Sequence, residues 1–541
     1  MSELYSKFLE CGIITTDSRD CPAGSIFFAL KGESFNGNQY AAAALEKGCA
    51  YAVIDEAQYA LDDRYIVVPD VLTTLQQLAN EHRRALGTPI IGITGTNGKT
   101  TTKELIATVL SQKYNVLYTQ GNFNNHIGVP KTLLRLTPEH DIAVIEMGAN
   151  HPGEIKTLVN IVEPNYGIIT NVGKAHIEGF GSFEGVIRTK GELYDFLRER
   201  KRAMGSSASL VQDALRASSK VQDASLVQEV QDASLVQEVQ DASLVLRQGS
   251  GEQSSEQEDS YRSTAGAYRS AAYRSEPSSR IVPVPNGTVF IDTDNPHLIG
   301  ISQGLTLVPY VKGEVIACDP FLRFRWSPEG EESYRSTAGA YRSHEVTYRS
   351  EAYRSEQSSR IVPVNVNVPV YEVQTHLIGA YNMKNMLAAA TIGLAFGITP
   401  EQINEALAGY VPTNNRSQLT VTEHNRLIVD TYNANPTSMM AALQNFVLMA
   451  VEPKMAILGD MGELGSISGE EHQKIVDYLL QHHLDNVWLV GKEFGNIDSP
   501  FRKFANVAEV KEALAAQRPE GQYILIKGSN SNRLFELPEL L

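Results

Sequence analysis

Continuous apolar runs, separated by amphipathic segments, divide the centre of this 541-residue chain into alternating strands and helices. Three such runs end in glycine: "PIIGITG" (89–95), "DIAVIEMG" (141–148) and "YGIITNVG" (166–173). Uninterrupted apolar runs are typical of strands that a parallel sheet buries on both faces. The helical periodicity between the runs therefore predicts βαβ units over residues 88–193.

Strands and helices also alternate towards both ends of the chain. Residues 1–85 combine short apolar strands, such as "SIFFAL" and "YAVID", with a helical stretch at 71–86, which predicts a small α/β domain. After residue 366, helical patterns separate four apolar strands: "RLIVDTY" (426–432), "KMAILGD" (454–460), "NVWLVG" (486–491) and "YILIKGS" (523–529). This alternation predicts a Rossmann-like C-terminal domain.

Two tracts break the pattern. A nine-residue unit, "VQDASLVQE", starts at Val221, recurs at Val230 and recurs in its first seven residues at Val239. A Tyr/Arg/Ser-rich tract at 260–285 has a close copy from Ser333. A nine-residue period moves the apolar group to the opposite face of a helix or strand with each repeat. We therefore expect low complexity and disorder over 202–286 and 332–365. The tracts are open to interpretation as a natural insertion, a product of how the chain was made, or interaction segments.

The chain is expected to be globular and to have several domains, because 541 residues exceed one ordinary domain. We expect an α/β fold of three domains, at 1–85, 86–411 and 412–541, with the tracts inserted in the second. The net charge of −16 argues against a nucleic-acid partner. Four cysteines without a C-x-x-C pair, no signal-peptide pattern and no long apolar run predict a cytoplasmic protein without a membrane span.

The stretch "TGTNGKTT" (94–101) lies between a predicted buried strand and a predicted helix, which is the setting of a phosphate-binding loop. Glycines allow backbone N–H groups to surround phosphates at a helix N-terminus. The lysine can reach the β- and γ-phosphates, and the following threonine can bind Mg²⁺. The predicted nucleotide-binding residues are Gly95, Thr96, Asn97, Gly98, Lys99, Thr100 and Thr101.

This loop has Ile93 where the strict Walker A pattern has its first glycine, and in that form it resembles the ATP loop of Mur ligases and folylpolyglutamate synthases. The resemblance extends over most of the chain outside the tracts, and it implies an ATP-dependent amide ligase that uses Mg²⁺. It also implies that Glu146, His176 and Lys190 join Thr100 around the metal, with Lys190 carbamylated. Lys99, Glu146, His176 and Lys190 are thereby the implied catalytic residues.

The resemblance also implies the ligand contacts. Asn382 and Asn385, three apart on one helical face, resemble an adenine-binding signature, in which Tyr381 replaces a histidine. Arg416 is implied to reach the γ-phosphate and Asp430 the ribose. Asn124 and Asn125 resemble a substrate-facing loop, while Ser18, Arg19 and Lys31 resemble uridine-diphosphate contacts. Asp292 is a departure, because the family pattern has Asn there, and the second tract interrupts a region of expected sheet.

Tyr432, Asn433 and Asn435 in "YNANPTS" resemble the branch of the Mur ligases that adds D-alanyl-D-alanine to UDP-N-acetylmuramoyl-tripeptide in peptidoglycan synthesis. The resemblance implies those two compounds as partners, and we expect a monomer. Two alternatives remain open at this point. In the first, the chain is a related ligase with another acceptor, such as the folylpolyglutamate type. In the second, it is a catalytically impaired chain whose ligase-like ends are joined by interaction repeats.

Overall fold

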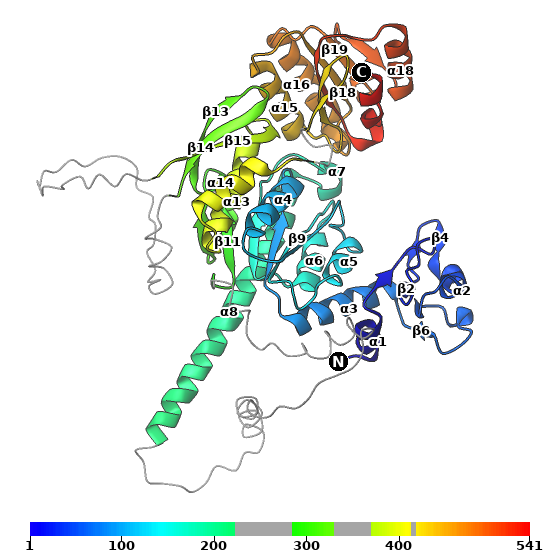
Figure 1. The fold of residues 1–541 in the computed structure, drawn as a ribbon, viewed down its shortest axis with the longest axis vertical. Helices are drawn as coiled ribbons and strands as arrows, with labels where there is room; N and C mark the ends of the chain where they lie inside the picture. The colour runs from blue at the N-terminus through cyan, green and yellow to red at the C-terminus, as the bar shows by residue number, and fades with distance from the viewer. Residues whose placement is uncertain (222–283, 329–368, 413–417) are drawn as a thin grey trace, which may run out of the picture.

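The computed structural model describes residues 1–221, 284–328, 369–412 and 418–541. It is a mixed α/β structure built on three parallel or mostly parallel sheets, so the predicted fold class is confirmed. In Figure 1 the N-terminal sheet lies beside the central sheet, and the C-terminal sheet lies at the far end of the molecule. None of the helices within the described ranges has the length and apolar character that crossing a lipid bilayer requires.

The N-terminal unit is a four-stranded parallel sheet in the order β1-β2-β5-β6. Its strands are β1 (Ile14–Thr15), β2 (Ile26–Phe28), β5 (Tyr51–Ile54) and β6 (Tyr65–Val67). A short hairpin of β3 (Lys31–Gly32) and β4 (Phe35–Asn36) follows β2. The helices are α1 (Glu3–Cys11), α2 (Ala41–Glu46) and α3 (Val71–Leu86), with 3-10 turns at Gly37–Tyr40 and Ala57–Tyr59. The predicted helix at 71–86 is confirmed.

The central sheet has six parallel strands in the order β12-β11-β10-β7-β9-β8. They are β7 (Ile90–Thr94), β8 (Val116–Tyr118), β9 (Ile142–Glu146), β10 (Tyr166–Ile169), β11 (Thr288–Ile291) and β12 (Thr306–Pro309). The helices around it are α4 (Lys99–Leu110), α5 (Gly128–Leu133), α6 (Glu154–Val162), α7 (Ile177–Phe180), α8 (Phe183–Val221) and α11 (Pro296–Ile301). Every residue of β7, β9 and β10 is buried, as their uninterrupted apolar sequences predict.

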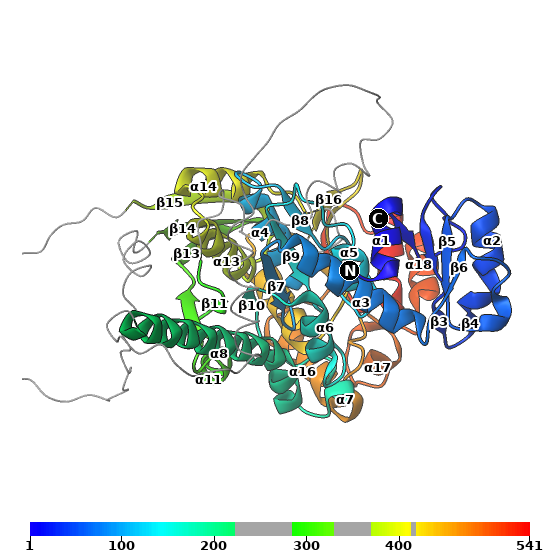
Figure 2. The same ribbon diagram turned by 90° about the horizontal axis from the view of Figure 1, so that it is seen from below.

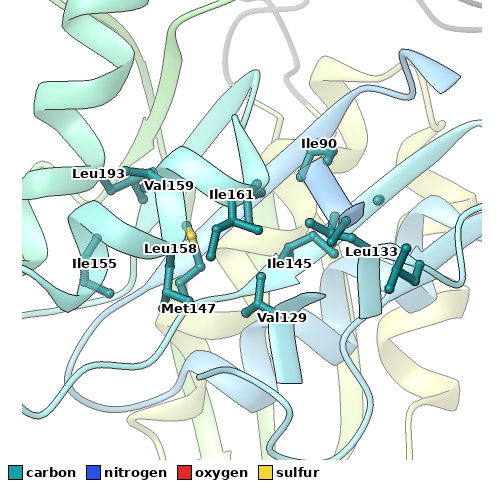
Figure 3. Packing of buried hydrophobic residues seen from close by; sticks show 14 of the residues in the cluster. Ile90, Val129, Leu133, Ile145, Met147, Ile155, Leu158, Val159, Ile161 and Leu193 are labelled. Carbon is teal, nitrogen blue, oxygen red and sulfur yellow. The ribbon is translucent and has the colours of Figure 1, made fainter. Parts of the chain in front are cut away.

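Side chains of the central sheet and of its helices pack into one continuous core. Figure 3 shows Ile145 of β9 between Val129 and Leu133 of α5 and the apolar face of α6, which includes Leu158. Helix α3 packs against both α5 and α6, so this core also anchors the N-terminal unit. The edge of the sheet at which the strands end is thereby held on a rigid base.

A three-stranded antiparallel sheet follows the central one, with β13 (Lys312–Cys318), β14 (Phe321–Ser327) and β15 (Tyr371–Ile378). Strands β14 and β15 pair although the second tract separates them, so the expected regular sheet is present. Asp292, at the end of β11, bonds Lys384 at 2.9 Å and so ties the central sheet to α13 (Asn382–Ala395). Helix α14 (Pro400–Gly409) begins with Thr399 in a capping box.

The C-terminal sheet has six strands in the order β16-β17-β21-β18-β19-β20, of which only β16 is antiparallel to its neighbour. The strands are β16 (Gln418–Val421), β17 (Arg426–Asp430), β18 (Lys454–Gly459), β19 (Val487–Val490), β20 (Arg502–Phe504) and β21 (Tyr523–Lys527). The helices are α15 (Pro436–Leu448), α16 (Ser468–Gln481), α17 (Lys492–Gly495) and α18 (Val507–Ala516), with 3-10 turns at Gly465–Ile467, Asn530–Asn532, Leu534–Glu536 and Pro538–Leu540. The four predicted strands are confirmed, while the edge strands β16 and β20 were not predicted.

Helix α8 runs through the predicted start of the first tract. Disorder was expected from residue 202, whereas the structure continues the helix to Val221, and Figure 2 shows it extending away from the sheets. Ala, Leu, Gln, Lys and Arg are good helix formers, so a helix can form there without a continuous apolar stripe. The rest of the tracts, at 222–283 and 329–368, lies outside the described residues.

Candidate active site

A cavity of about 770 Å³ lies where the central sheet meets α13 and the C-terminal sheet. This volume falls within the range of about 300–1,000 Å³ that is common for small-molecule sites. Its lining includes most of the predicted site: Gly95, Thr96, Asn97, Gly98, Lys99, Thr100, Thr101, Asn124, Asn125, Glu146, His176, Lys190, Asn382, Asn385, Asp430, Tyr432 and Asn433. Residues from three distant parts of the sequence therefore share one space.

The loop at 95–98 turns from β7 into α4 with two glycines in left-handed backbone conformations. Gly95 has φ +142° and Gly98 has φ +76°. A Cβ atom at Gly95 would lie 2.1 Å from Thr170 Oγ1, and one at Gly98 would lie 2.7 Å from Asn385 Oδ1. Both positions therefore require glycine, for space as well as for backbone conformation. The tight turn places the start of α4 at the cavity, and the first N–H groups of a helix have no partner within the helix.

Lys99 is the first residue of α4 and lines the cavity. Its Nζ donates to the carbonyl oxygens of Gly95, at 2.8 Å, and Thr96, at 3.1 Å. The ammonium group is therefore held over the loop at the end of the helix where anions are favoured. A phosphate chain lying along the loop would meet this charge directly.

Glu146 ends β9, and because β9 and β7 are adjacent parallel strands, it stands beside the loop, as predicted. Its side chain is only 1% exposed. Thr100 Oγ1 donates to Glu146 Oε2 at 3.0 Å, and Asn124 Nδ2 donates to Oε1 at 2.9 Å. The carboxylate and the threonine hydroxyl thus form a compact group of oxygen atoms at the floor of the cavity.

Lys190, on α8, is 2% exposed and donates to Ala149 O at 3.1 Å. Burial, with a smaller contribution from the charge of Lys99, lowers the pKa of Lys190 to about 7. This amine is consequently uncharged in a substantial fraction of molecules near neutral pH. His176 hydrogen-bonds Glu463 of the C-terminal unit, and burial lowers its pKa as well.

The C-terminal unit contacts the phosphate-loop region directly. Asn435 caps α15 and exchanges side-chain amide hydrogen bonds with Asn97, at 2.7 and 3.3 Å. Lys174 pairs with Glu471 at 2.9 Å on the same side. Asn435 does not line the cavity itself, but its contact with Asn97 brings the C-terminal unit onto the loop. The C-terminal unit is thus in contact with this edge of the central sheet.

The predicted nucleoside contacts are also close together. Asn385 Nδ2 donates to Asn382 Oδ1 at 2.9 Å, and Thr102 of α4 donates to Asn385 Oδ1 at 3.0 Å. Asp430 lines the cavity from the end of β17 and pairs with Lys527 at 2.6 Å. Arg416, the expected γ-phosphate contact, lies outside the described residues.

Three predicted contacts do not reach the cavity. Ser18, Arg19 and Lys31 belong to the N-terminal unit; Arg19 pairs with Asp17 at 2.8 Å, and Lys31 pairs with Asp55 at 2.8 Å. The loop after β1, which holds Ser18 and Arg19, is nevertheless adjacent to the central unit, since Lys131 of α5 donates to Thr16 Oγ1 at 3.3 Å. A long substrate could therefore extend from this loop past Asn124 and Asn125 into the cavity.

Two residues at the site were missed in the sequence. Lys527 is 1% exposed and lines the cavity. Its place at the end of the apolar run "YILIK" could have identified it in the sequence, because a buried lysine needs a partner. Glu463, the partner of His176, lies in a positive-φ turn. Its contact depends on how the two units are arranged, for which the local sequence holds no signal.

Comparison with known proteins matches all three units to one family. The family "Mur ligase middle domain" matches residues 93–254, "Mur ligase, glutamate ligase domain" matches 415–530, and "Mur ligase family, catalytic domain" matches 10–83. Two curated relatives bear the name UDP-N-acetylmuramoyl-tripeptide–D-alanyl-D-alanine ligase. The Escherichia coli protein is 28% identical, over 100% of this chain and 95% of its own length. The Bacillus subtilis protein is 28% identical, over 97% and 92%.

Solved structures show the same fold. MurF from Acinetobacter baumannii has a TM-score of 0.66 at 24% identity, covering 97% of this chain and 92% of its own. The MurF ligase from Thermotoga maritima, in complex with ADP, has a TM-score of 0.68 at 20% identity, covering 100% and 98%. The arrangement of the three units is therefore shared with ligases of this kind.

Proposed function

Because the chain belongs to the Mur ligase family, we propose that it is an ATP-dependent ligase that joins D-alanyl-D-alanine to UDP-N-acetylmuramoyl-tripeptide, with release of ADP and phosphate. The observation that carries this proposal is that the phosphate loop, Glu146 at the end of β9 and the "YNANPTS" segment all line one cavity. The names of the full-length relatives support the choice of substrates. The product is a peptidoglycan precursor.

The reaction follows from the chemistry of the carboxylate. The terminal carboxylate of the tripeptide attacks the γ-phosphorus of ATP, which forms an acyl phosphate and ADP. The amine of D-alanyl-D-alanine then attacks the acyl carbon, inorganic phosphate leaves, and an amide forms. The first step brings anions together, so the site must supply positive charge where the phosphoryl group is transferred. Lys99 and the backbone N–H groups of 95–101 supply it.

The residues present fit a magnesium ion. Mg²⁺ prefers oxygen ligands, keeps several waters, and is commonly held by one or two carboxylates together with substrate phosphates. Thr100 and Glu146 offer such oxygens, whereas no group of three His, Cys, Asp or Glu suited to a metal occurs in the described ranges. When bound, the ion would neutralise charge on the phosphate oxygens during transfer.

His176 and Lys190 complete the proposed metal site, on the condition that Lys190 is carbamylated. Lys190 donates a hydrogen bond as an ammonium or amine and is no ligand in that form. Its low pKa leaves a neutral amine that can add to CO₂ and lose a proton, giving an anionic carbamate. We infer that Lys190 acts on the metal as the carbamate. His176 stands close by, oriented by Glu463.

The remaining assignments divide the substrates among the three units, which we place at 1–85, 86–411 and 412–541. Asn382 and Asn385 face the adenine, and Asp430 the ribose, with Arg416 at the γ-phosphate. Ser18, Arg19 and Lys31 hold the uridine diphosphate, and Asn124 and Asn125 the muramoyl part. Tyr432, Asn433 and Asn435 lie on the dipeptide side. One chain supplies all of these residues, so we expect a monomer to be active, and we expect it in the cytoplasm, where ATP is available.

The test is phosphate release by the full chain with each substrate omitted in turn. We expect release only when ATP, Mg²⁺, UDP-N-acetylmuramoyl-tripeptide and D-alanyl-D-alanine are all present, because the acyl phosphate is consumed only by the amine. L-alanyl-L-alanine is the matched control and should give little release. Release that does not depend on the dipeptide, or that requires a folate acceptor instead, would refute the assignment.

A further inference from the structure

Lys103 is a fully buried cation one turn along α4 from Lys99. Its side chain is 0% exposed, and its Nζ makes no hydrogen bond within the described part of the chain. The ring of Tyr118 lies 5.8 Å from the ammonium group. Lysines are almost never fully buried without a partner, since removing the charge from water is costly. The position therefore requires an electrostatic explanation.

Two carboxylates supply that explanation. Nζ lies 3.5 Å from an oxygen of Glu104 and 3.8 Å from Oε2 of Glu146. Glu104 is partly exposed and also accepts a hydrogen bond from Tyr410 at 2.6 Å. Glu146 is buried, so its charge interacts with Lys103 in a medium that screens poorly. The fully buried partner of Lys103 is thus the carboxylate at the floor of the cavity.

The three side chains around the Glu146 carboxylate differ in whether a bound ligand could contact them. Thr100 and Asn124 line the cavity and are open to contact by an incoming nucleotide or substrate. Lys103 does not line the cavity and approaches Glu146 from the protein side. Ligand binding can redirect the two hydrogen bonds, whereas the ammonium group stays in place. Lys103 is consequently the permanent neighbour of this carboxylate.

We propose that Lys103 is a positioning residue that serves as the internal counter-charge of Glu146. Before the metal binds, Lys103 holds this carboxylate in the position in which it later contacts the metal. The ammonium group compensates the buried charge until the cation arrives with the nucleotide. Free Mg²⁺ should therefore bind only weakly to the wild-type protein when no nucleotide is present. The metal part of this inference rests on the proposed function, while the pairing of the two charges does not.

The test uses thermal unfolding of the full chain without nucleotide. Lys103→Met keeps the length of the side chain and removes its charge. We expect it to lower the melting temperature by about 5 °C in EDTA, because breaking a buried pair leaves a carboxylate uncompensated. In a Glu146→Gln background the same change should cost less than about 2 °C, since no charge is then left behind. Lys7→Met, which removes a helix-surface pair with the exposed Glu3, is the control and should lower the melting temperature far less.

Addition of about 10 mM Mg²⁺ alone gives the second readout, because a cation that binds only the folded state raises its stability. We expect Mg²⁺ to restore several degrees to Lys103→Met, and to change neither the wild-type protein nor the double variant by more than about 1 °C. A role for Lys103 in packing alone would not produce this response. If Lys103→Met is insoluble, Lys103→Gln is measured in the same two backgrounds.

Equal losses of melting temperature in both backgrounds would overturn the inference, and so would a coupling between the two residues without any response to Mg²⁺. Failure of the proposed function is a separate result. It would appear as phosphate release that ignores the dipeptide, in a wild-type protein whose Lys103 and Glu146 are still coupled.

Discussion

Replacing Lys99 with alanine is expected to lower kcat for phosphate release by about 10²–10³-fold or more, the loss that follows removal of one donor to a transition-state oxyanion. The ammonium group lies over the loop that would hold the triphosphate, and it is held there by Gly95 and Thr96. Negative charge accumulates on the transferring phosphoryl group, so the lost interaction is stronger in the transition state than in the bound substrate. The effect should therefore fall mainly on kcat rather than on KM.

Steady-state kinetics with saturating UDP-N-acetylmuramoyl-tripeptide and dipeptide measure this effect. Lys113→Ala is the matched control, because Lys113 lies just beyond the other end of α4 and its side chain donates only to Gly397 O, at 3.1 Å, among the hydrogen bonds described for it. That variant should keep its activity. A Lys99→Ala protein that retained a tenth of the wild-type kcat would show that the loop does not hold the reacting phosphate.

Glu146→Gln is expected to reduce kcat by about 10²-fold and to raise the Mg²⁺ concentration that gives half-maximal activity at least about tenfold. Glutamine preserves the volume of the side chain and one acceptor for Thr100, but it removes the anionic oxygens. Glu146 is the only carboxylate that Thr100 contacts among the hydrogen bonds described for it, so no neighbouring acid can replace it there. The loss should be partly relieved at high Mg²⁺.

The measurement is a Mg²⁺ titration of activity, well below the melting temperature of the variant, because Lys103 also loses a counter-charge in this protein. Glu154→Gln is the control, since Glu154 also lines the cavity but binds backbone N–H groups of its own turn. Its half-maximal Mg²⁺ concentration should change less than about twofold. An unchanged Mg²⁺ requirement in Glu146→Gln would remove this carboxylate from the metal site.

The central part of the site could be predicted because its signals are local. The buried strand before Gly95 and the helix after Lys99 define the phosphate loop, and the adjacent parallel strand places Glu146 beside it. Asn382 and Asn385 were also predictable, because residues three apart in a helix lie on the same face. In the loop and in the asparagine pair a short stretch of sequence determines the geometry, while the place of Glu146 also depends on the parallel pairing of β7 and β9.

Contacts between residues far apart in the sequence could not be predicted in this way. The amide pair of Asn97 and Asn435 joins residues 338 positions apart, and the pair of Asp430 and Lys527 joins the ends of two neighbouring strands. The first depends on how the C-terminal unit lies on the central one, and the second depends on the strand order within the C-terminal sheet. The edge strands β16 and β20 were missed because they are short and only partly apolar.

Transfer of an ¹⁸O label tests the central claim most directly, namely that the carboxylate of the tripeptide is phosphorylated by ATP in this cavity. The terminal carboxylate of UDP-N-acetylmuramoyl-tripeptide is labelled with ¹⁸O, the full reaction is run, and the phosphate released is analysed by mass spectrometry. Attack of the carboxylate on the γ-phosphorus, followed by displacement by the amine, predicts one ¹⁸O atom in each phosphate. Phosphate that contains no ¹⁸O, released at the same rate as product, would contradict the account.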